Sequence, residues 1–253
     1  MELIDSHCHL DDDRYDGIRE QVMARASAVG IRKIIIPATT ANRWEKVKQV
    51  AESAPGLFPA YGLHPMFIEQ HQVVHMRELD EWLDREKPIA VGECGLDFFH
   101  SRRDEKWQIS LFNEQLQLAN NHRLPVIVHV RKAMDQVISQ LRKHAHCGGV
   151  IHSFAGSRQQ AGQLFDLGFK LGIAATVGFE RAKKLRAVVA SMPVEALLLE
   201  SDAPDQPGVN HRGELNQPAY IIEHLQSIAE LRQCDPQELA RVMSRNSEQL
   251  FGI

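Results

Sequence analysis

Short apolar runs alternate with longer amphipathic segments along the whole chain. In the longer segments, apolar residues recur every three or four positions, which is typical of helices that bury one face; one example is formed by Ile18, Val22, Ala26 and Val29. The short runs have the length and extended character of buried strands. Eight such runs are expected to form strands, at Leu3–His9, Lys33–Thr39, Leu57–His64, Ile89–Glu93, Pro125–Val130, Gly149–Ser153, Lys170–Ala175 and Ala196–Asp202.

Eight strand and helix units in 253 residues predict an α/β fold, a single (β/α)8 TIM barrel with parallel strands inside and helices outside. No tract rich in proline, glycine and serine divides the chain, so residues 1–253 are expected to form one domain. The irregular segment Pro204–Pro218 is expected to be a loop over the mouth. Near the end, Asp235, Pro236 and Glu238 predict a helix start, because they supply an N-cap, a proline at the first helical position and an acid at the third.

Composition places the chain among ordinary globular proteins. Hydrophobic residues make up 43% and charged residues 25%, which excludes the disordered and fibrous classes. No leader-like segment and no apolar stretch of membrane-spanning length is present, so we expect a soluble, cytoplasmic, monomeric protein without a membrane partner. The four cysteines form no C-x-x-C pair and are expected to be reduced. The net charge of −4 argues against broad attraction to long duplex DNA, although it leaves open the binding of a nucleic acid end.

The candidate chemistry lies at the ends of the expected strands. In a barrel of this kind, the carboxyl ends of the strands carry the active site. His7 and His9 are two residues apart on an extended segment, so both imidazoles point to the same side and can bind one divalent metal. Further metal-ligand types end other strands, namely Glu93 on the fourth, His129 on the fifth, His152 on the sixth and Asp202 on the eighth.

This set suits one metal ion or a close pair. Glu93, in the middle of the strand order, is the natural bridge between two ions. His7, His9 and Asp202 would complete one site, because the first and eighth strands are neighbours in a closed barrel, and His129 and His152 would complete the other. Mixed imidazole and carboxylate ligands accept zinc, magnesium, manganese or cobalt, so the sequence does not select the metal. Two such ions activate water and clamp a phosphoryl oxygen, which is hydrolase chemistry.

The strand-end motifs carry a resemblance to a known family. They are Asp5-Ser6-His7-Cys8-His9, Gly62-Leu63-His64-Pro65, Val91-Gly92-Glu93-Cys94-Gly95-Leu96-Asp97, His129-Val130-Arg131, His152-Ser153-Phe154-Ala155-Gly156 and Leu199-Glu200-Ser201-Asp202-Ala203-Pro204. In this order they resemble the TatD family of metal-dependent deoxyribonucleases, over essentially the whole chain. The resemblance implies a barrel of the amidohydrolase-like type, two divalent cations, and hydrolysis of phosphodiesters at DNA 3′ ends. It also implies that Asp202 is a metal ligand that acts as the general base.

For the other polar residues at or near the strand ends, the sequence allows both a functional and a structural interpretation. His64, which would act with Asp202 and Glu93 in catalysis, is expected to hydrogen-bond a phosphate or else to be a structural histidine. Arg131 and Arg212 would bind the phosphate, unless they form ion pairs at the rim. Glu200 is expected to orient a ligand, one layer below Asp202, and Asp97 to organise a loop rather than bind metal.

Two positions depart from the family pattern. The loop after the eighth strand has Glu214 where a lysine is usual and Gln217 where an acid is usual, which lowers the positive charge near the mouth. The substrate is therefore expected to be a DNA end or a small phosphodiester. The rival reading is an amidohydrolase-type reaction on a small ester, lactone or amide, and a third is a scaffold that retained the fold without the chemistry.

Overall fold

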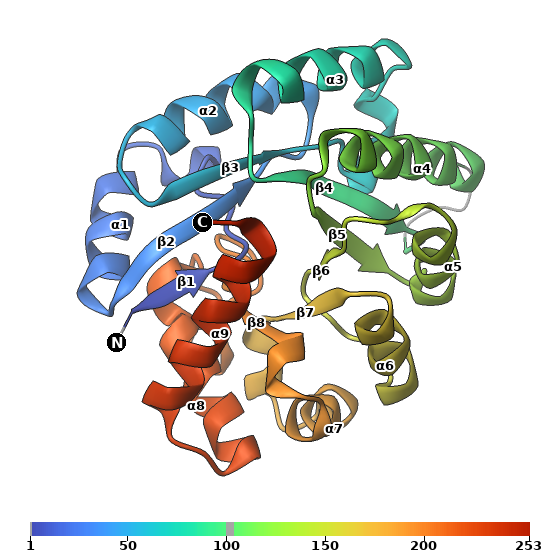
Figure 1. The fold of residues 1–253 in the computed structure, drawn as a ribbon. Coiled ribbons are helices and arrows are strands. Elements are labelled where there is room, and N and C mark those ends of the chain that lie inside the picture. The colour runs from blue at the N-terminus through green and yellow to red at the C-terminus, as the bar shows by residue number, and fades with distance from the viewer. Residues whose placement is uncertain (1, 100–103) are drawn as a thin grey trace.

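Eight parallel strands form a barrel in the centre of the computed structural model, which describes residues 2–99 and 104–253 (Figure 1). The strands follow one another around the barrel in chain order, each hydrogen-bonded to the next. The predicted (β/α)8 barrel is confirmed. The strands are β1 Leu3–Asp5, β2 Ile31–Pro37, β3 Leu57–Tyr61, β4 Ala90–Asp97, β5 Val126–Arg131, β6 Gly149–Ile151, β7 Phe169–Ile173 and β8 Leu197–Leu199.

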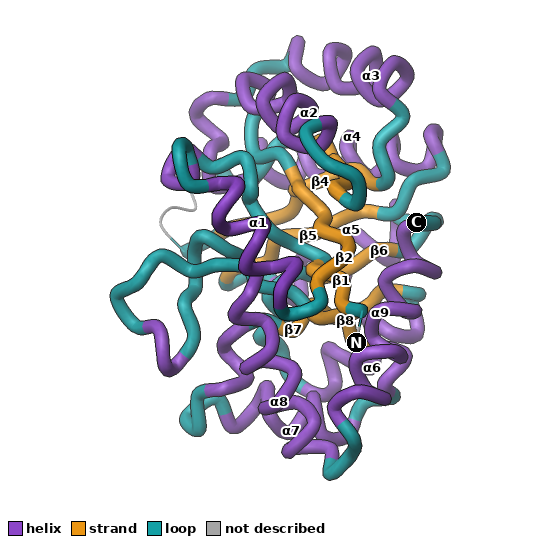
Figure 2. The backbone as a smooth tube through the Cα atoms, turned by 90° about the vertical axis from the view of Figure 1, so that its left-hand side faces the viewer, coloured by secondary structure: helices purple, strands orange, loops and turns teal. Residues whose placement is uncertain are grey.

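Helices surround the strands on the outside, as the purple ring around the orange strands in Figure 2 shows. The last of them begins as predicted: Asp235 Oδ1 accepts hydrogen bonds from the backbone N–H groups of Gln237 and Glu238, and Pro236 is the first helical residue. The helices are α1 Arg19–Ala28, α2 Trp44–Glu52, α3 Val74–Glu86, α4 Glu105–His122, α5 Met134–His144, α6 Arg158–Asp166, α7 Lys183–Ser191, α8 Ile221–Arg232 and α9 Pro236–Phe251.

The barrel closes between its first and last strands through the segments that follow them. The backbone N–H of Ser6 donates to the carbonyl of Leu199 at 3.0 Å, and the N–H of Asp202 donates to the carbonyl of His7 at 2.9 Å. Cys8 and Ala203 form one further parallel bridge. These bonds place the residues after β1 beside the residues after β8, so the histidine pair and Asp202 meet at the mouth.

Several strand ends differ from the prediction. β1 ends at Asp5 and β8 at Leu199, so the residues expected on these strand ends lie just beyond them, in irregular segments. The cause is visible at the seam, where Asp5 Oδ1 accepts the backbone N–H groups of His7 and Ser201 and so replaces ladder bonds. β3 and β6 likewise end before His64 and His152, whereas β4 continues past Glu93 to Asp97. The other ends differ by one to two residues.

The lower half of the barrel interior is apolar. One buried side chain from each of six strands packs there, and Phe251 at the end of α9 covers the layer from below. The six are Ile35, Ala60, Ala90, Ile127, Val150 and Leu198. Within the described ranges, none of the helices has both the length and the apolar character needed to cross a membrane.

Candidate metal centre

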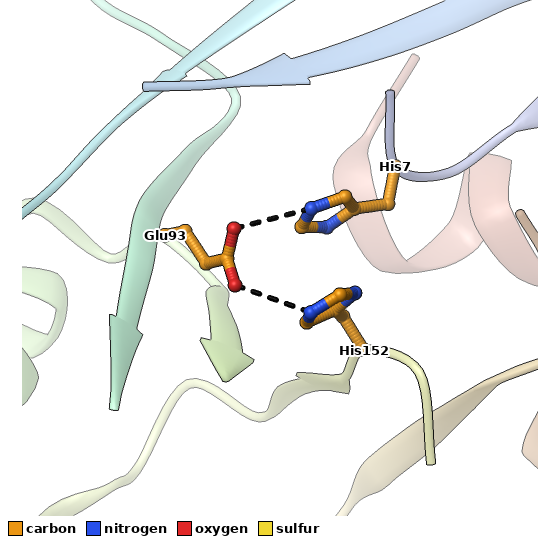
Figure 3. A group of neighbouring side chains, drawn as sticks. All are labelled: His7, Glu93 and His152. Atoms are coloured by element: carbon orange, nitrogen blue, oxygen red, sulfur yellow. Dashed lines mark ion pairs between the residues drawn. The ribbon is translucent and has the colours of Figure 1, made fainter. Parts of the chain in front are cut away.

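Glu93 lies at the centre of a group of histidines in the upper half of the barrel. Its carboxylate is almost completely buried between His7 and His152 (Figure 3). Oε2 lies 3.2 Å from His7 Nε2, and Oε1 lies 3.2 Å from His152 Nε2. The two imidazole rings are stacked, with their centroids 3.9 Å apart. The two oxygens of one carboxylate therefore face different histidines.

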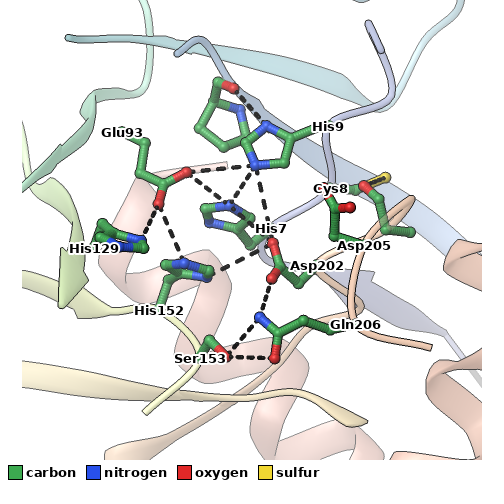
Figure 4. Close-up of polar contacts among 12 residues, drawn as sticks. His7, Cys8, His9, Glu93, His129, His152, Ser153, Asp202, Asp205 and Gln206 are labelled. Carbon is green, nitrogen blue, oxygen red and sulfur yellow. Dashed lines mark hydrogen bonds and ion pairs between the residues drawn. The ribbon is translucent and has the colours of Figure 1, made fainter. Parts of the chain in front are cut away.

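Four ligand atoms gather on the Oε2 side. His9 Nε2 lies 3.4 Å from Glu93 Oε2 and 3.3 Å from His7 Nε2. Asp202 Oδ1 lies 3.6 Å from His7 Nε2 and 3.9 Å from His9 Nε2 (Figure 4). Atoms that bind one cation tetrahedrally at roughly 2.0–2.1 Å are about 3.4 Å apart. The spacing of the ligand atoms of His7, His9 and Asp202 thus fits a single divalent cation, and Glu93 Oε2 lies beside the two histidines.

A second group of nitrogens surrounds the other oxygen of Glu93. His129 Nδ1 lies 3.1 Å from Oε1, beside the His152 contact already described. His64 Nε2 lies 3.0 Å from the same oxygen. The structure thus brings together all six residues expected as metal ligands, and it places His64 beside them.

The hydrogen bonds of the outer ring nitrogens set the tautomers of two histidines. His9 Nδ1 lies 3.2 Å from the carbonyl oxygen of Pro37, which can only accept, so Nδ1 carries the proton and Nε2 presents a lone pair to the centre. His129 Nε2 lies 3.0 Å from Asp97 Oδ2 and donates to it, which directs Nδ1 toward Glu93 Oε1. Both rings are thus oriented with one nitrogen toward the centre.

His64 has the opposite tautomer. The backbone N–H of Met66 donates to His64 Nδ1 at 3.0 Å, so that nitrogen carries no proton. Burial lowers the pKa of His64 to about 4, so the ring is neutral at pH 7 and its single proton is on Nε2. His64 is therefore an N–H donor toward Glu93 and the cavity. This state suits the predicted contact with a phosphate better than metal ligation.

The buried charges fit a cation. Burial alone would raise the pKa of Glu93, but the surrounding imidazoles, His64 and His152 first, hold it well below its usual range. Burial lowers the pKa of His7 and raises the pKa of Asp202 to about 6. Glu93 Oε2 accepts no hydrogen bond from the described residues although it is buried, and a cation would supply the missing partner. The donor set and this orphaned oxygen both fit a divalent metal.

A layer of polar residues below and beside the centre holds it in place. Glu200 is fully buried, and its carboxylate lies 3.5 Å from His152 Nδ1 and accepts the backbone N–H of Ser153. This agrees with the orienting role expected for it. The space for Glu200 is provided by Gly172, where a Cβ atom would lie 2.0 Å from Glu200 Oε2. Asp202 Oδ2 accepts a hydrogen bond from the side chain of Gln206 (Figure 4).

Asp97 has two contacts, only one of which was expected from the sequence. Its Oδ1 accepts the backbone N–H of Phe99 at 2.9 Å, which organises the loop after β4. Its Oδ2 holds His129, as described above, so it also positions a candidate ligand. The Gln206 contact was missed as well, because Gln206 lies in a loop without regular pattern.

Of the two arginines expected to bind substrate, only Arg131 lines the cavity at the metal centre. Arg131 lines a cavity of about 510 Å³ that contains Glu93, His129, His152 and Asp202; we call it the β4–β8 cavity. Its guanidinium lies 3.6 Å from the ring centroid of Phe99, and no carboxylate of the described residues forms an ion pair with it. Arg212 is exposed, lies 5.1 Å from the ring centroid of Phe179 and does not line this cavity.

The two residues that depart from the family pattern make contacts within the rim. Glu214 Oε2 lies 2.9 Å from His211 Nδ1, and the His211 ring stacks on Tyr220 with centroids 3.5 Å apart. Gln217 Oε1 accepts a hydrogen bond of 2.6 Å from Arg25 Nε, which ties the loop to α1. Both residues thus fasten the loop after β8.

A barrel with these imidazole and carboxylate groups at the carboxyl end of its strands defines a metal-dependent hydrolase. The chain belongs to the TatD family, because residues 4–252 match the family described as TatD related DNase. It is 39% identical to YjjV of Escherichia coli K12, named an uncharacterized metal-dependent hydrolase, over 99% of this chain and 98% of that protein. It is 30% identical to YabD of Bacillus subtilis, which has the same description, over 99% of each chain.

Solved structures agree with the sequence relatives. The crystal structure of E. coli YjjV, described as a TatD homolog, matches with a TM-score of 0.95 at 38% identity, and the match covers 99% of this chain and 98% of that chain. A hydrolase of the TatD family from Entamoeba histolytica matches with a TM-score of 0.85 at 21% identity, over 99% of this chain and 98% of that one. The second match supports the fold alone.

Proposed function

We propose that this protein hydrolyses phosphodiester bonds at the 3′ ends of DNA with two divalent metal ions. The observation that carries the proposal is the carboxylate of Glu93, whose two oxygens each face a separate set of ligand atoms. When bound, a pair of divalent cations supplies Lewis acidity, which activates water and neutralises charge on a phosphoryl group. The description of the family as DNase-related supports DNA as the substrate.

The residues around the centre have distinct tasks in this reaction. His7, His9 and Asp202 would hold one ion, His129 and His152 the other, and Glu93 both. Asp202 accepts the proton of the attacking water, for which its Oδ2 faces away from the histidines toward Gln206. His64 Nε2–H and the guanidinium of Arg131 stabilise negative charge that develops on the phosphate oxygens. Arg212 has no part in this scheme, because it does not line the cavity.

The bond changes are those of an ordinary hydrolysis. The oxygen of water bonds to phosphorus, and the bond from phosphorus to the 3′ oxygen of the preceding nucleotide breaks. The proton of the water passes to Asp202, the departing 3′ oxygen takes up a proton from solvent, and Asp202 then releases its own to solvent. The products are a terminal nucleoside 5′-monophosphate and a strand shortened by one residue with a free 3′ hydroxyl.

Single-stranded oligonucleotides labelled separately at each end test the proposal in the presence of zinc, magnesium, manganese or cobalt. We expect shortening from the 3′ end only, and only with metal. An Asp202→Asn variant should retain bound metal and lose turnover, because Asn cannot accept the proton. Inert DNA together with cleavage of a small ester or lactone would overturn the proposal in favour of the amidohydrolase-type reaction.

A further inference from the structure

A second cavity opens on the other side of the metal centre. Its volume is about 350 Å³, and it lies between the loops that follow β1, β2 and β3; we call it the β1–β3 cavity. It shares His9, His64, Met66 and Asp205 with the β4–β8 cavity. A substrate that spans both cavities therefore has its middle at the metal centre and one end in each.

The two cavities differ in how their cations are paired. In the β1–β3 cavity, Arg14 forms hydrogen bonds of 2.9 Å with both Asp12 and Asp205. Arg43 is paired with Asp11 at 3.0 Å and with Asp13 at 2.8 Å. Each arginine is thus matched by two carboxylates. In the β4–β8 cavity, by contrast, Arg131 has no such partner among the described residues.

The β1–β3 cavity consequently has an excess of negative charge. Its lining contains four aspartates and two arginines, so two negative charges remain. Outside the lining, Lys46 contacts Asp13 and Asp16, and Asp16 is also paired with Arg19 at 2.6 Å, so the neighbouring ion pairs reduce this excess without cancelling it. Hydrogen bonds from Lys46 and Arg43 lower the pKa of Asp13 to about 2, so this carboxylate is charged at pH 7. An anion in this cavity would be repelled.

The rest of the lining suits a flat, uncharged group. Phe67 lies edge-on to His64, with ring centroids 5.8 Å apart, so an aromatic surface begins directly beside the metal centre. Met66 adds a half-exposed thioether, and Thr39 and Gln70 add groups that form hydrogen bonds. Nucleobases stack on aromatic rings whatever their identity. The volume is at the lower end of small-molecule sites, enough for one residue of a strand.

We propose that the β1–β3 cavity binds the uncharged terminal nucleoside of the strand and rejects a strand that ends in a phosphate. The inference rests on the proposed function, in which the phosphate to be cleaved lies at the metal centre. The preceding part of the strand, with its phosphates, then occupies the β4–β8 cavity near Arg131. A 3′-terminal phosphate would enter the β1–β3 cavity and meet its four carboxylates.

Two oligonucleotides of one sequence, ending in a 3′ hydroxyl or a 3′ phosphate, test this specificity. With the metal-loaded enzyme, we expect kcat/KM to be about tenfold higher for the hydroxyl end, because a terminal phosphate would meet several like charges at close range. Asp13→Asn and, from the opposite loop, Asp205→Asn should each reduce this preference severalfold. Both side chains are more than half exposed, so the fold should tolerate their replacement. Asp166→Asn, an equal loss of charge at an exposed position on α6, should leave the preference unchanged.

The possible outcomes separate this proposal from the proposed function. Equal or faster cleavage of the phosphate end would overturn the specificity and leave the nuclease function intact. A preference for the hydroxyl end that neither aspartate variant reduces would also overturn it, since the carboxylates would not be its cause. Failure to cleave either oligonucleotide with any of the four metals would overturn the nuclease function and this inference together.

Discussion

The two ends of the barrel interior are built from the same strands and have opposite character. In β4, Ala90 belongs to the apolar lower layer and Glu93 to the metal centre; in β5, Ile127 and His129 do the same only two residues apart. The lower layer buries side chains that need no partner, which stabilises the fold. The upper layer buries charged groups, which costs free energy unless they are paired. Stability and chemistry are therefore separated along each strand, as in barrels of this class generally.

Among substitutions that test this separation of the two layers, Glu93→Gln is expected to have the largest effect. The substitution keeps the volume and removes the charge that both halves of the centre share. We expect the purified protein to lose bound metal and its hydrolase activity to fall by well over ~100-fold, more than the loss of a residue that merely supports a ligand. Elemental analysis and circular dichroism would check this. Normal metal content in a folded variant would show that Glu93 is not the shared ligand.

At the other end of the barrel, Leu198→Ala should lower stability and leave the metal centre unchanged. Leu198 is fully buried in the lower layer, so its truncation leaves a cavity and should lower the free energy of unfolding by about 2–5 kcal/mol. The metal content and the activity per folded molecule should equal those of the protein without the substitution. Thermal unfolding measures the first effect, and active-site titration with metal measures the second. Val73→Ala, at a side chain that is 74% exposed, is the control and should change stability by less than about 0.5 kcal/mol.

The sequence was sufficient to find the upper layer but not its internal contacts. His7, His9, Glu93, His129, His152 and Asp202 could be found because a barrel brings all strand ends to one edge. The contact of Asp97 with His129 depends on the register of β4 and β5, which pairs Gly95 with His129 and Asp97 with Arg131. Register is set by packing, so the sequence alone could not supply it. The position of Arg212 depends on the path of an irregular loop, and the sequence alone could not supply that path either.

The ends of β1 and β8 were predicted too far toward the mouth for a related reason. The residues after β1 and β8 directly continue apolar runs, and they do lie side by side. There the side chains of Asp5 and Ser201 accept backbone N–H groups in place of regular strand bonds, a tertiary effect that the hydrophobic pattern does not report. The starts of the strands, at the apolar end of the barrel, were located within two residues.

A smaller effect on metal binding is expected from Asp97, which holds a candidate ligand in place but is not a ligand itself. In Asp97→Asn the residue retains its shape but loses the charge that holds His129 Nε2–H, so metal affinity should fall about 10–100-fold. Isothermal titration with zinc or manganese would measure it. The same Asp166→Asn control, remote from the centre, should bind metal normally. An unchanged affinity in Asp97→Asn would mean that packing alone orients His129.

The smallest effect is expected from Asp235→Ala, which touches neither layer directly. Asp235 caps α9 through hydrogen bonds of 2.8 and 2.9 Å to the N–H groups of Gln237 and Glu238, and the far end of α9 carries Phe251 to the lower layer. Loss of the cap should cost about 1 kcal/mol of stability, because two N–H groups at the helix start lose their acceptor. Asp235→Ser, which can still accept these bonds, should restore most of that loss. Metal affinity should be unchanged in both variants, since α9 supports only the apolar end of the barrel; a change would show that the two ends are coupled through the strands.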